Sequence, residues 1–466
     1  MTTTMGSNIL KNVSPGGVAR TPSAYKIDKV VITNAKGEAI DIQTISKEIL
    51  ITESIYSPTL VCEISVLDES NILETLPIYG LETVHIKIVQ IANTQEEGGE
   101  EFEIDRVFYI TEYPVYGRAR REHSQVWVLK GISFHAWQNP LLKISRGFAG
   151  PIADEIFKIG KEAFGLETLI QGAPISEGRG IINIQTPLQA IDWFRRRLFE
   201  EDGCCFYYYE TIQNEPNEIN LTSHSVLSSG EVHERYFDTR DYNVDVATAE
   251  DFLARKRRIL ESSSTLKLSK ALPAQGGAFA SENNFLDLSN RSFFKQYYDY
   301  EEDFPIDKTI YDTSILESPP EFDFEPDPAQ IESTSVVPEP IPNEVKLNTK
   351  FFSHMEHMSL NSDAFYNSDL QNYNVWSHEK VDVLNAFPGI FNTLVHDIVI
   401  FGDFELNAGK VVELMMPKAA DPAHTGIEEL WDKHLSGKYI VISAIHRFKN
   451  QEYTTSFRAK RDSFTV

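Results

Sequence analysis

The chain has 466 residues, and its 69 aspartates and glutamates outnumber its 43 lysines and arginines, which gives a net charge of −26. This excess of negative charge argues against a protein that wraps nucleic acid or docks on an anionic membrane, because both need clustered lysine and arginine. The length allows about three domains of ordinary size. Hydrophobic residues at 41% and aromatic residues at 11% exclude a wholly disordered chain.

The three cysteines are a poor basis for a disulfide framework, because Cys204 and Cys205 are adjacent and Cys62 is left over. There is no C-x-x-C spacing for zinc, so we expect a protein that matures in a reducing compartment. Residues 1–25 lack the apolar core of a signal peptide, and their Ser, Thr, Gly and Pro content predicts a flexible arm. No run of about 18 apolar residues predicts a membrane span.

From about residue 26 to residue 135 the apolar residues repeat with a period of two. Val84, Ile86 and Ile88 share one face of such a run, as do Cys62 and Ile64. Turn signals separate the runs, which predicts an antiparallel β-sandwich or barrel. A short helix is expected only near residues 71–76.

Residues 136–248 change to a helical pattern. Pro151 is suited to open a helix, and Gly165 is suited to end it. Thr186 to Gln189 has the form of a capping box, which predicts a second helix that ends at Gly203. The aromatic run after it, residues 204–209, indicates a half-buried strand.

The middle of the chain is dominated by charge. Residues 255–258 (RKRR) are a basic patch, for which a solvated helix is a simpler interpretation than a nucleic-acid site. Residues 299–345 combine many carboxylates with many prolines, which predicts an extended linker or surface arm. From residue 380 the period returns to two, and residues 438–445 and 453–461 flank a polar turn at 449–451.

A search for catalytic chemistry finds little. No glycine-rich phosphate loop or G-x-S-x-G elbow is present. On a helix, His354 and His357 would share one face and could hold a metal, but no further ligand is signalled nearby. His446 lies in an apolar strand, where a packed or hydrogen-bonded histidine is the expected interpretation. We therefore predict no catalytic residue, no cofactor site and no metal site, and the sequence assigns no interaction residues.

Two other clusters have simple structural interpretations. Phe206 to Tyr209 could form a stacking platform for sugars or bases, but a half-buried strand is the more economical prediction. Arg195, Arg196 and Arg197 are followed by Glu200, Glu201 and Asp202, which favours ion pairs within one helix.

Three stretches together resemble a known family, the baseplate central hub protein of contractile-tailed bacteriophages. The second stretch also resembles the hub half of type VI secretion spike proteins. They are residues 53–68 (ESIYSPTLVCEISVLD), residues 187–203 (PLQAIDWFRRRLFEEDG) with the aromatic strand, and residues 401–412 (FGDFELNAGKVV) with residues 437–446 and 461–462.

The resemblance implies an α+β, mainly β fold with two antiparallel tube-type β-barrel domains and inserted smaller α/β domains, and the composition adds a long acidic proline-rich insertion. The predicted divisions are a flexible N-terminal arm (1–25), a first β-barrel (26–135), a helix-containing α/β domain (136–248), a connecting segment (249–298), the acidic proline-rich extended insertion (299–345) and a second β-barrel (346–466). The acidic insertion has no counterpart in the family.

The resemblance also implies a non-enzymatic virion protein of the tail baseplate, assembled in the host cytoplasm. As a homotrimer it would link the central spike to the tail tube, adapt threefold to sixfold symmetry and let DNA pass. Its implied partners are itself, the spike, a tail tube or tube-initiator protein, baseplate wedge proteins, the tape measure protein as a further candidate, and DNA only in transit.

Two alternatives stay open. The first is a tail-associated enzyme that degrades peptidoglycan or polysaccharide, supported by the abundant carboxylates. The second is a β-rich adhesin or carbohydrate-binding module. For the hub, the negative charge predicts a mainly acidic or neutral channel wall, because like charge would weaken sticking of DNA.

Overall fold

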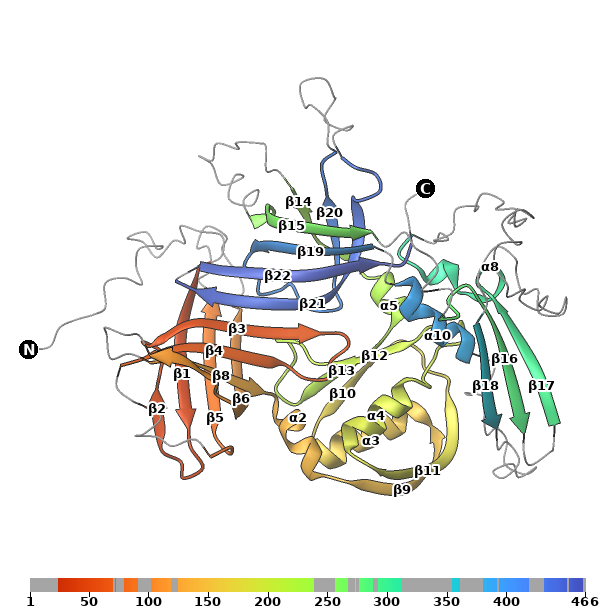
Figure 1. Cartoon of the computed structure of the whole chain (residues 1–466), viewed down its shortest axis with the longest axis horizontal. Coiled ribbons are helices and arrows are strands. Elements are labelled where there is room, and N and C mark those ends of the chain that lie inside the picture. The colour runs from red at the N-terminus through yellow and green to blue at the C-terminus, as the bar shows by residue number, and fades with distance from the viewer. Residues whose placement is uncertain are drawn as a thin grey trace, which may run out of the picture.

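The computed structural model describes residues 24–69, 72, 79–90, 102–118, 125–238, 256–266, 273, 276–287, 292–311, 354–360, 380–391, 394–418, 431–450 and 452–463. Strands dominate this part of the chain and helices are few (Figure 1). The predicted mainly β fold, with large antiparallel sheets and separate helical material, is confirmed. No helix in the described ranges is long and apolar enough to cross a membrane. The predicted arm lies outside them except for Ala24 and Tyr25.

The N-terminal strands form an antiparallel sheet in the order β3-β4-β8-β6-β5-β1-β2, with β7 on β8. Alternating residues such as Ile64, Ile86 and Leu129 fill one buried core, which is why the period of two was legible in the sequence. The strands are β1 (Tyr25–Thr33), β2 (Ala39–Asp41), β3 (Ser46–Ser54), β4 (Val61–Asp68), β5 (Thr83–Gln90), β6 (Glu103–Glu112), β7 (Val115–Arg118) and β8 (Gln125–Ile132).

A smaller α/β unit follows, in which two helices pack on short sheets. Gly165 ends α3 in the left-handed conformation as predicted, with a φ of 73°. The helix α4 starts at the predicted capping box but ends at Arg195, not at Gly203, because turns occupy the intervening residues. The elements are α2 (Phe134–Gln138), η2 (Asn139–Leu141), β9 (Ile144–Pro151), α3 (Ile152–Phe164), β10 (Glu167–Gln171), β11 (Glu177–Gln185), α4 (Pro187–Arg195), β12 (Phe206–Tyr209), β13 (Glu218–Ser223) and α5 (His224–Ser228).

A second group of strands continues the large sheet, and it contains the predicted hairpin, β21–β22. One prediction fails here, because the period-two region from residue 380 opens with the helix α10. In the basic patch Lys256 is helical, Arg257 and Arg258 lead into the strand β15, and Arg255 lies outside the described ranges. The elements are β14 (Val232–Phe237), β15 (Ile259–Leu266), α10 (Val381–Ile390), β19 (Leu394–Phe401), β20 (Val411–Met415), β21 (Gly437–Lys449) and β22 (Glu452–Arg461).

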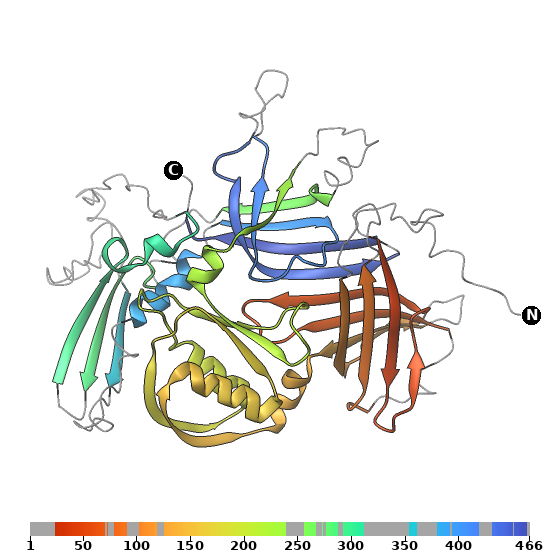
Figure 2. The same cartoon turned by 180° about the vertical axis from the view of Figure 1, so that it is seen from behind.

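A three-stranded sheet, in the order β17-β16-β18, lies at the opposite end of the molecule from the first sheet (Figure 2). The acidic stretch starts here, and residues 299–311 are not an extended linker. Tyr300 and Phe304 are buried beside Phe387, so two aromatic anchors hold this part against α10. Residues 312–345 lie outside the described ranges. The elements are β16 (Ala280–Asp287), β17 (Ser292–Asp299), α8 (Tyr300–Asp303), η3 (Ile306–Lys308) and β18 (His354–Leu360).

The two groups of strands are joined into one sheet. Strand β21 pairs antiparallel with β3, with Ser443 opposite Ser54 and Lys449 opposite Glu48. In Figure 1 the strands β19, β22, β21, β3 and β4 therefore follow one another without a break. The division into domains that the family resemblance implies stays a prediction.

Candidate functional site

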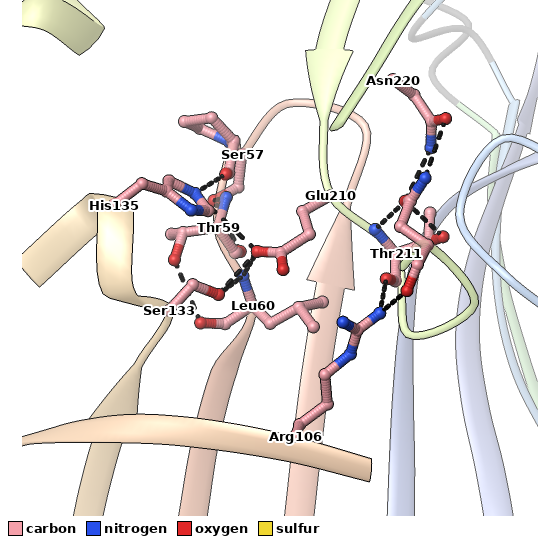
Figure 3. Close-up of polar contacts among 11 residues, drawn as sticks. Ser57, Thr59, Leu60, Arg106, Ser133, His135, Glu210, Thr211 and Asn220 are labelled. Carbon is pink, nitrogen blue, oxygen red and sulfur yellow. Dashed lines mark hydrogen bonds and ion pairs between the residues drawn. The ribbon is translucent and has the colours of Figure 1, made fainter. Parts of the chain in front are cut away.

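The most elaborate polar site in the described residues lies where the β12–β13 loop meets the first sheet. It borders a cavity of about 850 Å³ whose walls come from β6, α2, the end of α3 and residues 210–217. Figure 3 shows Arg106 of β6 and His135 of α2 beside Glu210 and Thr211 of the loop. Three buried charged residues organise it: Glu53 on β3, Arg106 on β6 and Glu210 just after β12.

Glu210 binds the start of β4 and the end of β8. One of its oxygens, Oε2, accepts hydrogen bonds from the Leu60 amide at 3.2 Å and the Ser133 hydroxyl at 2.6 Å. The same oxygen lies 3.8 Å from Nε2 of His135, whose ring also contacts the Pro58 carbonyl. This carboxylate therefore ties the loop to two strands of the first sheet.

Glu53 uses both of its oxygens. Oε2 accepts from the Ile212 amide at 2.8 Å, and Oε1 accepts from the Ala408 amide at 2.6 Å. Ile212 is in the β12–β13 loop and Ala408 is in the β19–β20 connection, so one side chain holds three parts of the chain. Complete burial penalises the charged form and raises the pKa of Glu53 to about 7, although both backbone bonds oppose the shift.

Arg106 holds the loop from the other side. Its Nη2 donates to the carbonyls of Thr211 and Ile212, at 3.3 and 3.1 Å, and to that of Asn214. Asn214 in turn closes the loop on itself by accepting from the Thr211 amide at 2.8 Å. Burial lowers the pKa of Arg106, while the neighbouring carboxylates, Glu210 foremost, oppose that shift.

The chemistry of this arrangement is structural. A general acid or base must face the proton that it transfers, but both Glu53 oxygens and one Glu210 oxygen already accept hydrogen bonds from protein groups. Buried carboxylates satisfied in this way fix backbone positions. No group of three or more His, Cys, Asp or Glu side chains that could hold a metal occurs within the described ranges.

A second buried polar cluster, formed by His224, Asp462 and Tyr207, connects the end of the C-terminal strand to α5. Nε2 of His224 lies 2.7 Å from Oδ2 of Asp462, and Nδ1 lies 3.1 Å from the Tyr207 hydroxyl. The other Asp462 oxygen accepts from the Ile310 amide at 3.0 Å. This polar cluster holds the residues just after η3 against the body of the protein.

The histidines singled out in the sequence are not brought together. His354 and His357 lie in β18, not on a helix, and their backbones pair with Ser281 and Asn284. Because a strand has a period of two, the helical geometry on which a shared metal depended is absent. His446 is buried and its Nδ1 lies 2.8 Å from the Tyr453 hydroxyl, which confirms the packed, hydrogen-bonded interpretation.

The aromatic and arginine clusters also differ in detail from the predictions. The run Phe206 to Tyr209 is a strand, but it is fully buried rather than half-buried, since packing covers both of its faces. Arg195 and Arg196 do form pairs within the helix, but with Asp192 rather than with the acidic residues that follow. Arg197 instead stacks on the Trp193 ring.

Sequence reasoning missed all three charged residues of the junction. Glu53 lies inside the ESIYSPTL stretch, where alternation places it on the buried face between Ile51 and Ile55. That position was the available signal, because a carboxylate on a buried face needs partners. Arg106 lies within the apolar strand β6, and Glu210 directly follows the apolar strand β12. Both charged residues therefore gave a similar signal that they need buried partners.

The fold has counterparts among solved structures. The 43 kDa tail protein of prophage MuSo2 from Shewanella oneidensis matches with a TM-score of 0.50 and 10% identity, over 93% of this chain and 99% of that one. The chain shares its fold with a phage tail protein. At the level of the fold, this agrees with the family resemblance inferred from the sequence.

Two further structures match at lower TM-scores. The tail protein from Neisseria meningitidis MC58 gives 0.47 at 11% identity, over 94% of this chain and 97% of that one. The E. coli c3393 protein, a type VI secretion component described as similar to T4 tail proteins gp27 and gp5, gives 0.41 at 7% identity, over 94% and 77%. No family model and no curated protein matches the sequence.

Proposed function

We propose that this protein is a non-enzymatic baseplate central hub of a contractile phage tail. It forms a homotrimer, links the central spike to the tail tube and leaves a channel for DNA. The fold shared with the MuSo2 tail protein is the observation that carries the proposal. The protein is then a virion component of the baseplate, assembled in the host cytoplasm.

The joined sheet supports the symmetry part of this proposal. Each chain carries two groups of antiparallel strands, connected edge to edge through β3 and β21. Three such chains present six groups of strands, which is the number that a sixfold tube requires. Backbone pairing between the groups fixes their relative orientation, as a ring needs.

The exposed face of the joined sheet is the surface that we assign to the channel. On β21, Arg447 and Lys449 both contact Glu48 of β3, at 2.5 and 3.2 Å. Arg458 forms a two-point pair with Asp397, at 2.8 and 3.2 Å. Two carboxylates, Glu48 and Asp397, therefore offset two of these three cations, which lowers the attraction of this face for DNA.

The partners follow from this position. The ring would contact the tail tube or its initiator on one side and the spike on the other. The α/β unit, which extends below the joined sheet in Figure 1, and the β16–β18 sheet to its right would then be available for the spike, wedge proteins and the tape measure protein.

The junction chemistry favours this function over a wall-degrading enzyme. The buried carboxylates of Glu53 and Glu210 hold backbone amides, which is a structural role. If the protein were such an enzyme, the purified chain would clear suspensions of cell-wall material. If it were a carbohydrate-binding module, it would bind glycans on an array.

Native mass spectrometry tests the proposal. The purified protein, alone and with the spike protein of the same particle, should give the mass of a trimer and of a trimer bound to a trimeric spike. A stable monomer that joins neither spike nor tube protein at micromolar concentration would overturn the proposal.

A further inference from the structure

The sheet formed by β9 and β11 has one buried side and one exposed side. Successive residues of a strand point to opposite sides of a sheet, and on the inner side Phe148 and Ile182 are buried in the core of the α/β unit. On the outer side the residues are exposed, and in Figure 1 the two strands form the lower border of the molecule. We define the β9–β11 face by six of these outer residues: Lys143, Gly147, Ala149, Arg179, Ile181 and Ile184.

The apolar centre of this face projects from the sheet. Ile181 and Ile184 are 69% and 68% exposed. Ile181 lies opposite Gly147, and Arg179 lies opposite Ala149, so that β9 places only small side chains beside the larger ones of β11. Exposed large apolar side chains that lie together are typical of a surface that contacts another protein.

Ile184 has an unusual backbone conformation. Its φ of 36° falls in the left-handed region, which a β-branched residue rarely adopts. The register of the β9–β11 pairing shifts between Ile182 and Gln185, and this irregularity turns the Ile184 side chain to the exposed side. Strained positions of this kind are concentrated where function requires them. Here the strained residue directs a second isoleucine toward solvent.

The two charged residues of the β9–β11 face are both cations. Lys143 and Arg179 are exposed, and neither forms an ion pair with a described residue, Glu177 of the same strand included. They lie in a chain whose net charge is −26. A surface that fits this face should combine an apolar recess with carboxylates, because charges across an interface are arranged to be complementary.

The cavity beside the β12–β13 loop offers an apolar recess. Its volume of about 850 Å³ lies within the range of about 300–1,000 Å³ that is usual for binding clefts. Val107, Tyr109 and Phe134 contribute to its wall. Val107 and Phe134 are exposed, so this apolar part of the wall is accessible from outside.

The cavity is also lined by carboxylates, of which one is available at its mouth. Lys87 forms ion pairs with Glu103 and Asp105, and Glu210 is buried. Glu215 is exposed and forms no ion pair with a described residue. A cation brought to the mouth of the cavity would therefore meet the unpaired carboxylate of Glu215.

The face and the cavity suit a contact between two chains. The β9–β11 face points away from the core of its own α/β unit, whereas the cavity lies where that unit meets the first sheet. A contact between two different surfaces of identical chains is head-to-tail, and its repetition closes a ring when the rotation allows it. Three such contacts would close the homotrimer, and in this respect the inference rests on the proposed function.

We propose that the β9–β11 face of one chain docks in the cavity of a second copy of the chain. Ile181 and Ile184 lie against the apolar wall of the cavity, and Arg179 lies against Glu215 of the neighbouring chain. The contact occupies one side of the α/β unit, so its other sides remain available to the partners proposed above.

Charge reversal with rescue tests this docking in the full-length protein. Arg179→Glu and Glu215→Arg should each raise the concentration at which half of the trimer dissociates by about tenfold or more, as measured by mass photometry. The double variant Arg179→Glu, Glu215→Arg should recover assembly, because opposite charges again face each other. Both side chains are exposed, so the melting temperature of the monomer should not change.

The matched control reverses a charge elsewhere on the first sheet. Lys36 is exposed and belongs neither to the β9–β11 face nor to the cavity lining. Lys36→Glu should therefore assemble at the same concentration as the wild type.

Cross-linking locates the contact without any substitution. In an equal mixture of ¹⁴N- and ¹⁵N-labelled wild-type protein, a zero-length carbodiimide reagent should link Lys143 to Glu215 or another carboxylate of the cavity. The linked peptides should join labelled to unlabelled chains, because the contact lies between two copies.

The outcomes separate the docking from the hub proposal. Trimers that form equally well in the wild type and in both single variants would overturn the docking and leave the hub proposal intact. A double variant that does not recover, or Lys143 links only within single chains, would do the same. A wild-type protein that never forms a trimer would overturn both proposals.

Discussion

The first sheet is fixed to the rest of the molecule in two different ways. Along β3 and β21 it is held by a ladder of backbone pairs with exposed ion pairs such as Arg447–Glu48 on its surface. At the β12–β13 loop it is held by the buried side chains of Glu53, Glu210 and Arg106.

The two attachments differ in how their stabilisation is distributed. In the β3–β21 backbone pairing it is spread over many equivalent hydrogen bonds, and each surface ion pair adds little. In the loop junction single oxygen atoms satisfy buried amides, so losing one acceptor leaves a buried donor unpaired. Substitutions at the loop junction should therefore cost far more than those on the face of the ladder.

The largest effect is expected for Glu53→Gln. The amide group keeps the size of the side chain but replaces one acceptor by a donor, so either the Ile212 or the Ala408 amide faces another donor. We expect a cost of about 2–4 kcal/mol, measured as a lower melting temperature. An unchanged melting temperature would show that the junction carries little of the stability.

The pH dependence of the same pair of proteins is a separate test. The pKa of Glu53 is about 7 in the folded protein and 4.5 ordinarily, so the folded state binds this proton more tightly. The contribution of Glu53 to stability is therefore fully present below about pH 4.5 and is lost as the pH rises through 7. The melting-temperature gap between wild type and Glu53→Gln should be wider at pH 5 than at pH 8. A gap that widens with rising pH would show that the pKa of Glu53 is not raised in the folded protein.

An intermediate effect is expected for Arg106→Lys. Lysine keeps the charge but lacks the planar fork, so it cannot reproduce the contacts to the carbonyls of Thr211, Ile212 and Asn214. We expect a cost of about 1–3 kcal/mol and faster hydrogen exchange confined to residues 211–217. Exchange that instead rises throughout β6 would indicate damage to the sheet itself.

A smaller effect is expected for Glu210→Gln. Only one oxygen of this carboxylate accepts from Leu60 and Ser133, and the carbonyl of a glutamine can take its place. The loss should be about 1 kcal/mol. Compared under the same conditions, Glu53→Gln should melt well below Glu210→Gln, and the reverse order would refute the two-oxygen argument.

The smallest effect is expected on the ladder. Arg447→Ala removes an exposed ion pair with Glu48, while Lys449 still contacts the same carboxylate. The expected change is within about 0–1 kcal/mol, and adding salt should reduce it further. A loss as large as that of Glu53→Gln would remove the contrast between the two junctions.

Local patterns in the sequence predicted elements well, because each depends on neighbouring residues. The period of two in β5 and the Gly165 helix end follow from such local rules. Predictions failed where distant contacts decide. The acidic residues 299–311 fold against the body because Tyr300 and Phe304 meet α10, about eighty residues away in the chain.

The junction itself was out of reach for the same reason. Glu53 acquires its role from the Ala408 amide, which a reader of the sequence cannot place beside it. The β3–β21 pairing likewise joins residues about 390 positions apart. A buried carboxylate in a strand indicates that it has a hydrogen-bond partner, but only the fold identifies that partner.

A single-particle image of the purified full-length protein tests the proposed trimeric hub. We expect a threefold ring with a central channel, lined by the exposed face of β19, β22, β21, β3 and β4, with neutral or acidic character. A monomer, an assembly without a channel, or a channel lined by unpaired lysine and arginine would contradict it.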